Sequence, residues 1–382
     1  MKQKFKKFTQ KIGSGLAQEL KETKDIPRHL KEKNFKAVAQ QLADIIKMML
    51  LALIWLLPAG IAVSGFIVKY SNKMRPTAFR KKENKMRIAI IGLGGVGGYI
   101  SASLAKSGYN VVGFARGQHL WKIQKNGIKI IEDSKTWITP LDARILEDAD
   151  GYFDVVLFCV KSYDLQISFE EIKPFTNSKT IMLSFSNGVS NGDILRSLSD
   201  SIVLDACIYI LSHIEDAGVI RKEGKVFATV FGGDENATKT LKSVFEEANL
   251  RVKTPADIKT AIWKKYIFIS AYATLTSYYD SSIAYVNEQH YDEAKELLTE
   301  IADVAKAKGI DIEDEIEKSL QTASKLPYDS STSMRLDFQS RKKTELESLS
   351  AYIVKEGLLH GVKTPLMEKM YKELEKREKE LS

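Results

Sequence analysis

The chain has 382 residues, of which 44% are hydrophobic and 28% charged, so it is long enough for two or three globular domains with complete cores. Its net charge of +8 is unevenly distributed, because residues 1–85 carry +13 and the remainder carries −5. The basic excess is confined to one segment, and nucleic-acid binding is not expected of the rest of the chain.

The few cysteines and histidines argue against both disulfide and metal chemistry. Cys159 and Cys207 lie in apolar, strand-like runs, which favours buried thiols in a reducing, cytoplasmic compartment over a disulfide framework. The five histidines are scattered, and no Cys/His cluster has metal-ligand spacing. We therefore expect no metal site.

Residues 48–68 are an uncharged stretch of 21 residues between basic flanks. As a helix this stretch would be about 31 Å long, enough to span a bilayer. Three interpretations stay open: a single span with the N-terminus outside, a membrane-interface hairpin broken near Pro58 and Gly60, and a buried helix of a soluble domain. We favour membrane association, so that residues 1–85 would be a leader that tethers a cytoplasmic catalytic domain.

A glycine-rich turn follows in residues 87–100, RIAIIGLGGVGGYI. An apolar strand-like run meets this turn and continues into a helical pattern, which is the context that a dinucleotide-binding turn requires. Gly92 would permit the tight turn, Gly94 would let the backbone approach a pyrophosphate, and Gly97 would let the helix pack on the strand. With Gly95 and Val96, these residues are the predicted cofactor-binding loop.

The second predicted strand, residues 109–115, ends at Arg116. An NAD-specific fold usually has an acidic residue here for the ribose 2′-hydroxyl, whereas this turn has a guanidinium, which suits a 2′-phosphate. Arg116 therefore predicts NADPH as the cofactor, with a solvated surface arginine as the alternative.

Three further strands are predicted at residues 154–160, 180–184 and 201–205, separated by segments able to form helices. The alternation is typical of a doubly wound, parallel, Rossmann-type sheet. Polar residues follow two of these strands, Lys161 and Asn187, where such sheets bind ligands. The alternatives are a solvent-facing cap for Lys161 and a left-handed turn residue for Asn187.

Beyond residue 257 the hydrophobic period becomes helical, and breaks near 309–313, 325–332 and 361–365 separate the predicted helices. The predicted fold is thus an α/β domain followed by an all-α domain. We place a hydrophobic, helical leader at 1–85, a dinucleotide-binding domain at 86–250 and a helical substrate domain at 251–382.

From residue 86 onward the chain resembles the ketopantoate reductases (2-dehydropantoate 2-reductases). The resemblance rests on IGLGGVGGYI, FARGQHL, CVKSYDL, SNGVSN and IYILSHIEDAGVIRKEG, which occur in the family's order. It implies that Arg116 contacts the NADPH 2′-phosphate, and that Lys161 and Asn187 lie along the cofactor towards the nicotinamide. Asn187 is also an expected substrate contact.

The resemblance also assigns residues of the helical half. IWKKYIF places Lys265 at the family's catalytic lysine, where an ammonium would stabilise the developing oxyanion and deliver the proton. TSMRLDFQSRKKTELE implies a substrate-carboxylate contact at Ser333 and an acidic site residue at Glu345, which would bind the substrate hydroxyl or hold Lys265. The family's asparagines four and eight residues after the lysine are replaced by Ile269 and Ala273.

The expected function is NADPH-dependent reduction of 2-dehydropantoate to (R)-pantoate, in the route to pantothenate and coenzyme A. Because Ile269 and Ala273 remove two polar contacts, a reductase of another small-molecule 2-keto acid stays open. So does a membrane-tethered NADP-binding sensor without turnover. A homodimer is expected as the oligomeric state, although nothing in the sequence fixes it.

Overall fold

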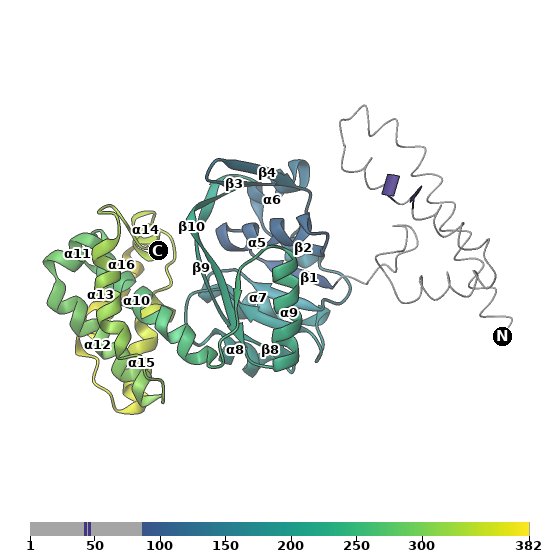
Figure 1. The fold of residues 1–382 in the computed structure, drawn as a ribbon. Coiled ribbons are helices and arrows are strands. Elements are labelled where there is room, and N and C mark those ends of the chain that lie inside the picture. Colours follow the sequence, from purple (N-terminus) through teal and green to yellow (C-terminus); the bar gives the residue numbers. More distant parts are fainter. Residues whose placement is uncertain (1–41, 44, 47–85, 382) are drawn as a thin grey trace. The chain divides into compact units, whose positions relative to one another are not determined.

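The structure is a computed structural model that describes residues 42–43, 45–46 and 86–381. The chain from Met86 onward forms one compact unit (Figure 1). The predicted membrane segment, residues 48–68, lies outside the described residues. Within the described ranges, no helix combines the length and apolar character needed to cross a bilayer.

The first half of this unit is built on a parallel sheet of six strands in the order β5-β2-β1-β6-β7-β8. This order and the helical crossovers confirm the predicted doubly wound, Rossmann-type fold. The strands are β1 (Arg87–Ile91), β2 (Asn110–Phe114), β5 (Asp142–Arg144), β6 (Val155–Phe158), β7 (Ile181–Ser184) and β8 (Ile202–Val203). Their connections include α5 (Gly95–Lys106), α6 (Gly117–Asn126), α7 (Leu165–Ile172) and α8 (Asn191–Leu198).

Strand β1 lies at the centre because its run of apolar residues can be buried on both faces of the sheet. Ile88 and Ile90 pack into the core that includes α5, whereas Ala89 and Ile91 pack into the core that includes α7. A fully apolar strand is what a parallel sheet covered on both faces requires. Ile91 pairs with Phe114 of β2 and with Phe158 of β6, so the carboxyl ends of three strands meet beside the glycine turn.

A second sheet, which the sequence analysis did not predict, covers α5. Its strands are β3 (Ile128–Glu132), β4 (Lys135–Thr139), β9 (Asp205–Asp216), β10 (Val219–Gly232) and β11 (Val252–Lys253), and α9 (Glu235–Glu247) precedes the last. The hairpin of β9 and β10 packs tightly on the start of α5. A Cβ at Gly95 would lie 2.3 Å from the Ser212 carbonyl oxygen, and one at Gly98 would lie 2.7 Å from Ile220.

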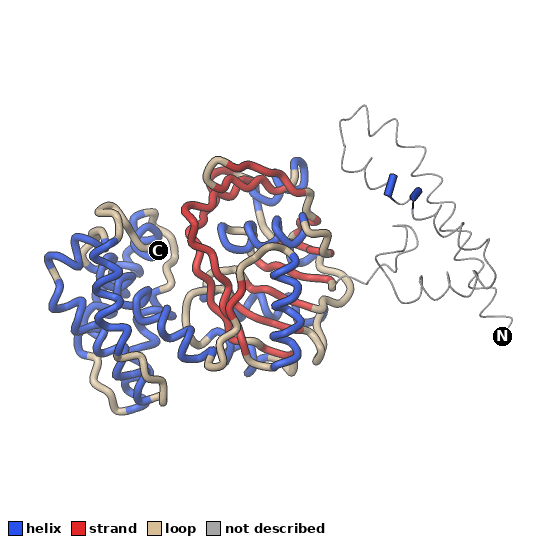
Figure 2. The backbone as a smooth tube through the Cα atoms, viewed as in Figure 1, coloured by secondary structure: helices blue, strands red, loops and turns tan. Residues whose placement is uncertain are grey.

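The second half is entirely helical, as predicted (Figure 2). Its α-helices are α10 (Ile258–Tyr278), α11 (Ile283–Gln289), α12 (Tyr291–Ala307), α13 (Asp314–Lys325), α14 (Ser333–Gln339), α15 (Tyr352–His360) and α16 (Pro365–Leu381). Asp257 caps α10 by accepting from the Thr260 N–H at 3.0 Å. In Figure 1 the β9–β10 hairpin lies on the side of the sheet that faces the helices, and α10 packs against both strands.

A π-helical segment, η5 (Glu347–Ala351), precedes α15 and is hydrogen-bonded to hydroxyl groups of α10. The Tyr266 hydroxyl donates to the carbonyl oxygens of Ser348 at 2.8 Å and Leu349 at 2.9 Å, and Ser270 donates to Leu349 at 2.7 Å. Thr274 bonds the Ser350 hydroxyl at 2.7 Å. These bonds from α10 hold in place the π-helical segment, which begins two residues after Glu345.

Replacing Tyr266 with Phe should therefore destabilise the protein. The variant keeps the ring contacts with Trp263 and Tyr352 but leaves the Ser348 carbonyl without its donor. Losing one hydrogen bond of this kind costs about 0.5–1.5 kcal/mol. Urea unfolding of the Tyr266→Phe variant should show this loss in the free energy of unfolding, and an unchanged value would contradict the assigned role.

Candidate active site

The glycine turn at the end of β1 has the geometry of an anion-binding loop. Gly92 adopts φ +93°, which is costly for other residues, and a Cβ at Gly97 would lie 2.0 Å from the Gly92 carbonyl oxygen. Gly94 differs, because a Cβ there would meet nothing within 4 Å. The open side of the turn thus lies at Gly94, at the N-terminus of α5, where a pyrophosphate fits.

A histidine ties this turn to its neighbours. His119 Nδ1 accepts from the Gly218 N–H at 3.0 Å, so Nε2 carries the proton and donates to the Leu93 carbonyl oxygen at 2.9 Å. Burial lowers the pKa of His119, against the opposing effect of its bond to Leu93. A neutral imidazole therefore connects the turn, α6 and the β9–β10 hairpin.

Arg116 lies at the carboxyl end of β2, where it is the N-cap residue of α6, and its side chain is exposed. No ion pair of Arg116 is found among the described residues. A neighbouring carboxylate would neutralise the guanidinium. A guanidinium without such a partner fits the binding of an anionic ligand. The residues present thus fit a phosphorylated dinucleotide, with Gly94 beside the pyrophosphate and Arg116 at the second strand.

The predicted Lys161, Asn187 and Glu345 come together between the sheet and the helices. The Glu345 side chain is 3% exposed. Its Oε2 accepts from Lys161 Nζ at 3.3 Å and from Asn187 Nδ2 at 3.4 Å, and its Oε1 accepts from the Ser162 N–H at 3.3 Å. These donors follow β6 and β7, so the carboxylate joins the helical half to the ligand-binding edge of the sheet.

Lys161 has a second acidic partner that the sequence analysis missed. Its Nζ donates to Asp337 Oδ2 of α14 at 2.8 Å. Burial lowers the pKa of Lys161, but the carboxylates of Glu345 and Asp337 raise it more, so this pKa lies above its ordinary value. The Lys161 ammonium is therefore a fixed charge, unsuited to giving up a proton.

Lys265 is held differently from Lys161. Its Nζ donates to Asn187 Oδ1 at 3.2 Å and lies 5.8 Å from the centre of the Tyr209 ring. Burial lowers the pKa of Lys265, against the opposing effects of Cys207 and Glu345. Glu345 thus acts on Lys265 through the Asn187 amide, which accepts from the lysine and donates to the carboxylate. Asn187 itself is not left-handed, whereas Gly188 adopts φ +123°.

The remaining predicted residues lie around this cluster. Ser333 is exposed in the first turn of α14, one turn before Asp337 and on the same helix face. Ile269 is partly buried, one turn after Lys265. Ala273 is 3% exposed and belongs to the core of the helical half, so of the two replaced positions only Ile269 presents surface.

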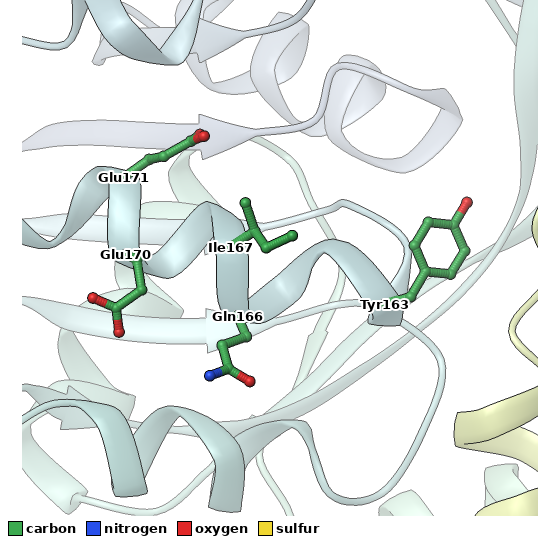
Figure 3. A pocket seen from close by; sticks show the side chains of 5 residues that line it. All are labelled: Tyr163, Gln166, Ile167, Glu170 and Glu171. Atoms are coloured by element: carbon green, nitrogen blue, oxygen red, sulfur yellow. The ribbon is translucent and has the colours of Figure 1, made fainter.

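A surface hollow elsewhere does not qualify as the active site. It is lined by Tyr163, Gln166, Ile167, Glu170 and Glu171, which lie along α7 and the turn before it (Figure 3). Its lining includes neither the glycine turn nor Lys265, and it has no basic group for a carboxylate or phosphate.

The sequence analysis missed Ser162, Asp337 and Tyr209. Ser162 adjoins Lys161, and its hydroxyl bonds the Ser348 hydroxyl at 2.7 Å. Asp337 lies within the TSMRLDFQ segment, four residues after Ser333, so helical spacing alone could have placed it near a substrate. Tyr209 lies within the IYILSHIEDAGVIRKEG stretch that carries the resemblance, but no role was assigned to it because it stands there as part of an apolar run.

Two family profiles match most of the described chain. The profile "Ketopantoate reductase PanE/ApbA" matches residues 88–235, and its C-terminal counterpart matches residues 257–378. The uncharacterized oxidoreductase YkpB of Bacillus subtilis is 27% identical over 77% of this chain and 100% of its own length. The 2-dehydropantoate 2-reductase of Mesorhizobium japonicum is 24% identical over 74% of this chain and 95% of its own.

Solved structures agree with these profiles. A PanE/ApbA family ketopantoate reductase from Ralstonia eutropha superposes with a TM-score of 0.73 at 28% identity. The match covers 78% of this chain and 99% of that structure. Both halves of the fold are thus found together in that relative.

The empty space beside Gly94 leads to a testable prediction. A Gly94→Ala variant should fold with an unchanged melting temperature, because Gly94 has φ −67° and its Cβ would meet no protein atom within 4 Å. The methyl group should nevertheless weaken nucleotide binding, since it would occupy the space assigned to the pyrophosphate. Calorimetric titration of the dinucleotide measures this.

Gly97→Ala is the matched comparison, because its Cβ would clash with the Gly92 carbonyl and should lower stability and binding together. Undiminished nucleotide affinity in Gly94→Ala would refute the placement of the pyrophosphate.

Proposed function

Given that the chain belongs to the ketopantoate reductase family, we propose that it reduces a 2-keto acid with NADPH, and that 2-dehydropantoate, giving (R)-pantoate, is its substrate. Members of this family are nicotinamide-dependent oxidoreductases that act on CH–OH groups. The observation that carries the proposal is the half-buried Lys265, which is hydrogen-bonded to Asn187 beside the ligand-binding edge of the sheet.

Lys265 is the proposed general acid. A keto oxygen that gains negative charge is stabilised by an ammonium within hydrogen-bond reach and then takes its proton. The bound cofactor supplies the hydride to the keto carbon. Because burial already lowers the pKa of Lys265, the ammonium releases its proton more readily than an exposed lysine.

Glu345 and Lys161 are assigned supporting roles. Glu345 orients the Asn187 amide so that its oxygen faces Lys265, which fixes the direction from which the proton is delivered. Lys161 keeps its charge and offers a cation to the cofactor or to the substrate carboxylate. Ser333, exposed one turn before Asp337, is proposed as a further contact of that carboxylate.

A second candidate is a reductase of a 2-keto acid without the hydroxymethyl group. It is favoured by Ile269, which stands one turn after Lys265, where an asparagine would bind a hydroxyl group. The sensor without turnover would be the conclusion if purified protein consumed no NADPH with any 2-keto acid.

Replacing Lys265 with Ala should lower kcat by roughly 10²–10⁴ while dinucleotide affinity stays nearly unchanged, as expected for lost proton transfer. In the wild type, kcat should fall as pH rises through the lowered pKa of Lys265, because the reaction needs the protonated form. This limb of the pH profile should disappear in the variant. Steady-state NADPH oxidation across pH measures both effects.

Lys264→Ala is the control, because this neighbouring lysine is paired with Glu315 at 3.2 Å. If Lys264→Ala lowers kcat as much as Lys265→Ala does, Lys265 is not the general acid.

Replacing Arg116 with Ala should weaken NADPH binding by about 1.5–3 kcal/mol, the range for hydrogen bonds to charged groups. NADH binding should hardly change, since NADH lacks the 2′-phosphate. Fluorescence titration of both cofactors is the measurement, with Arg221→Ala as control because Arg221 pairs with Glu215. Equal weakening of both cofactors would contradict the proposed phosphate contact.

Replacing Ile269 with Asn should shift preference towards hydroxylated substrates. The matched pair is 2-dehydropantoate and 3,3-dimethyl-2-oxobutanoate, which differ by one hydroxyl group. One added hydrogen bond should change the kcat/KM ratio by about 0.5–1.5 kcal/mol in favour of 2-dehydropantoate. If wild-type protein reduces only the deoxy compound, the second candidate replaces the first.

A further inference from the structure

The outward face of β9 carries apolar side chains that its partner strand does not cover. Residues 207, 209 and 211 share one face of the strand because side chains alternate. Cys207 is buried against Ile258 and Ile262 of α10, whereas Tyr209 is 38% and Leu211 is 59% exposed. From Tyr209 onward this face of β9 is therefore more exposed, and it stays apolar as far as Leu211.

The matching stripe on α10 runs through residues 258, 262, 265 and 269, which lie on one helix face. Ile258 and Ile262 contact the same cluster as Cys207, so the strand and the helix are in register there. The next residue pair along them is Tyr209 and Lys265, 5.8 Å apart. Leu211 and Ile269 follow as partly exposed apolar residues beyond the lysine.

Lys265 thus stands between a polar side and an apolar side. The polar side is Asn187 with Glu345 behind it, and the apolar side is the Tyr209 ring. Leu211 follows two residues further along β9, and Ile269 follows one turn further along α10. Burial, with smaller effects of Cys207 and Glu315, raises the pKa of Tyr209 to about 12, so its ring stays a neutral phenol. With its carboxylate on Lys161, as proposed above, a keto acid whose oxygen faces Lys265 directs its side chain away from this polar side, towards Tyr209.

We propose that Tyr209, with Leu211 and Ile269, forms the subsite for the substrate side chain and selects 2-keto acids with bulky, branched or aromatic apolar side chains. This inference rests on the proposed function and adds the substrate class to it. Tyr209 is the residue expected to contribute most apolar contact, because its partly exposed ring lies 5.8 Å from Lys265 Nζ.

The test compares full-length wild type with Tyr209→Ala and Tyr209→Phe, using pyruvate, 4-methyl-2-oxopentanoate and phenylpyruvate. Wild type should prefer both larger acids to pyruvate. Tyr209→Ala should lower the kcat/KM ratio of each larger acid to pyruvate by about tenfold or more, since even one methylene in an apolar pocket is worth that much. Tyr209→Phe should keep the wild-type ratios. Tyr152→Ala is the control, because Tyr152 is a 65% exposed tyrosine outside the site.

Two outcomes overturn the inference and leave the proposed function standing. One is an active Tyr209→Ala variant whose ratios equal those of wild type. The other is a Tyr209→Ala variant that keeps the wild-type kcat/KM ratios but binds the dinucleotide more weakly when no keto acid is present. That result would place the Tyr209 ring beside the cofactor. A wild type that reduces no keto acid would reject the proposed function itself and the inference with it.

Discussion

The buried carboxylate of Glu345 is the interaction on which the site depends. A carboxylate that is 3% exposed is tolerated only when charge and hydrogen bonds compensate for its lost hydration. Here the compensation comes from Lys161, from the Ser162 N–H and from the Asn187 amide, all on the sheet side. The helical half therefore cannot shift away from the sheet without exposing an unpaired charge. The same bonds orient the amide that holds Lys265, so the contact between the halves and the position of the proposed proton donor are fixed together.

The glycine turn and the apolar residues beside Lys265 are also connected, through the β9–β10 hairpin. Gly95 and Gly98 let the β9–β10 hairpin lie directly on α5, because any side chain there would meet Ser212 or Ile220. His119 also holds the same hairpin to the turn, through Gly218 and Leu93. Further along, β9 brings Tyr209 to Lys265. One strand thus runs from the turn assigned to the cofactor to the residues assigned to the substrate side chain, which explains why the turn has glycines beyond those that a phosphate needs.

The parts of this arrangement that were predicted from sequence are those encoded locally. The apolar run before Gly92, the polar residues after two strands and the change to a helical period all appear in short windows, and the structure contains the corresponding strands and helices. The second sheet was missed because it depends on pairing between distant segments, such as Ile220 with Ile130. Asp337 was missed for the same reason, since its partner Lys161 is 176 residues away. Spacing placed Ile269 and Ala273 on one helix face, but it could not show that Ala273 is sealed in the core.

The wide separation of Lys161 and Glu345, 184 residues apart, has a consequence for biosynthesis. When the ribosome has produced the chain as far as β11, the nascent protein already contains the glycine turn, Arg116, Lys161 and Asn187, together with the strands that hold them. It contains neither Lys265 nor Glu345. The residues assigned to the cofactor are therefore synthesised well before the proposed proton donor. The residues proposed to deliver the proton are thus completed only with the last part of the chain to be synthesised.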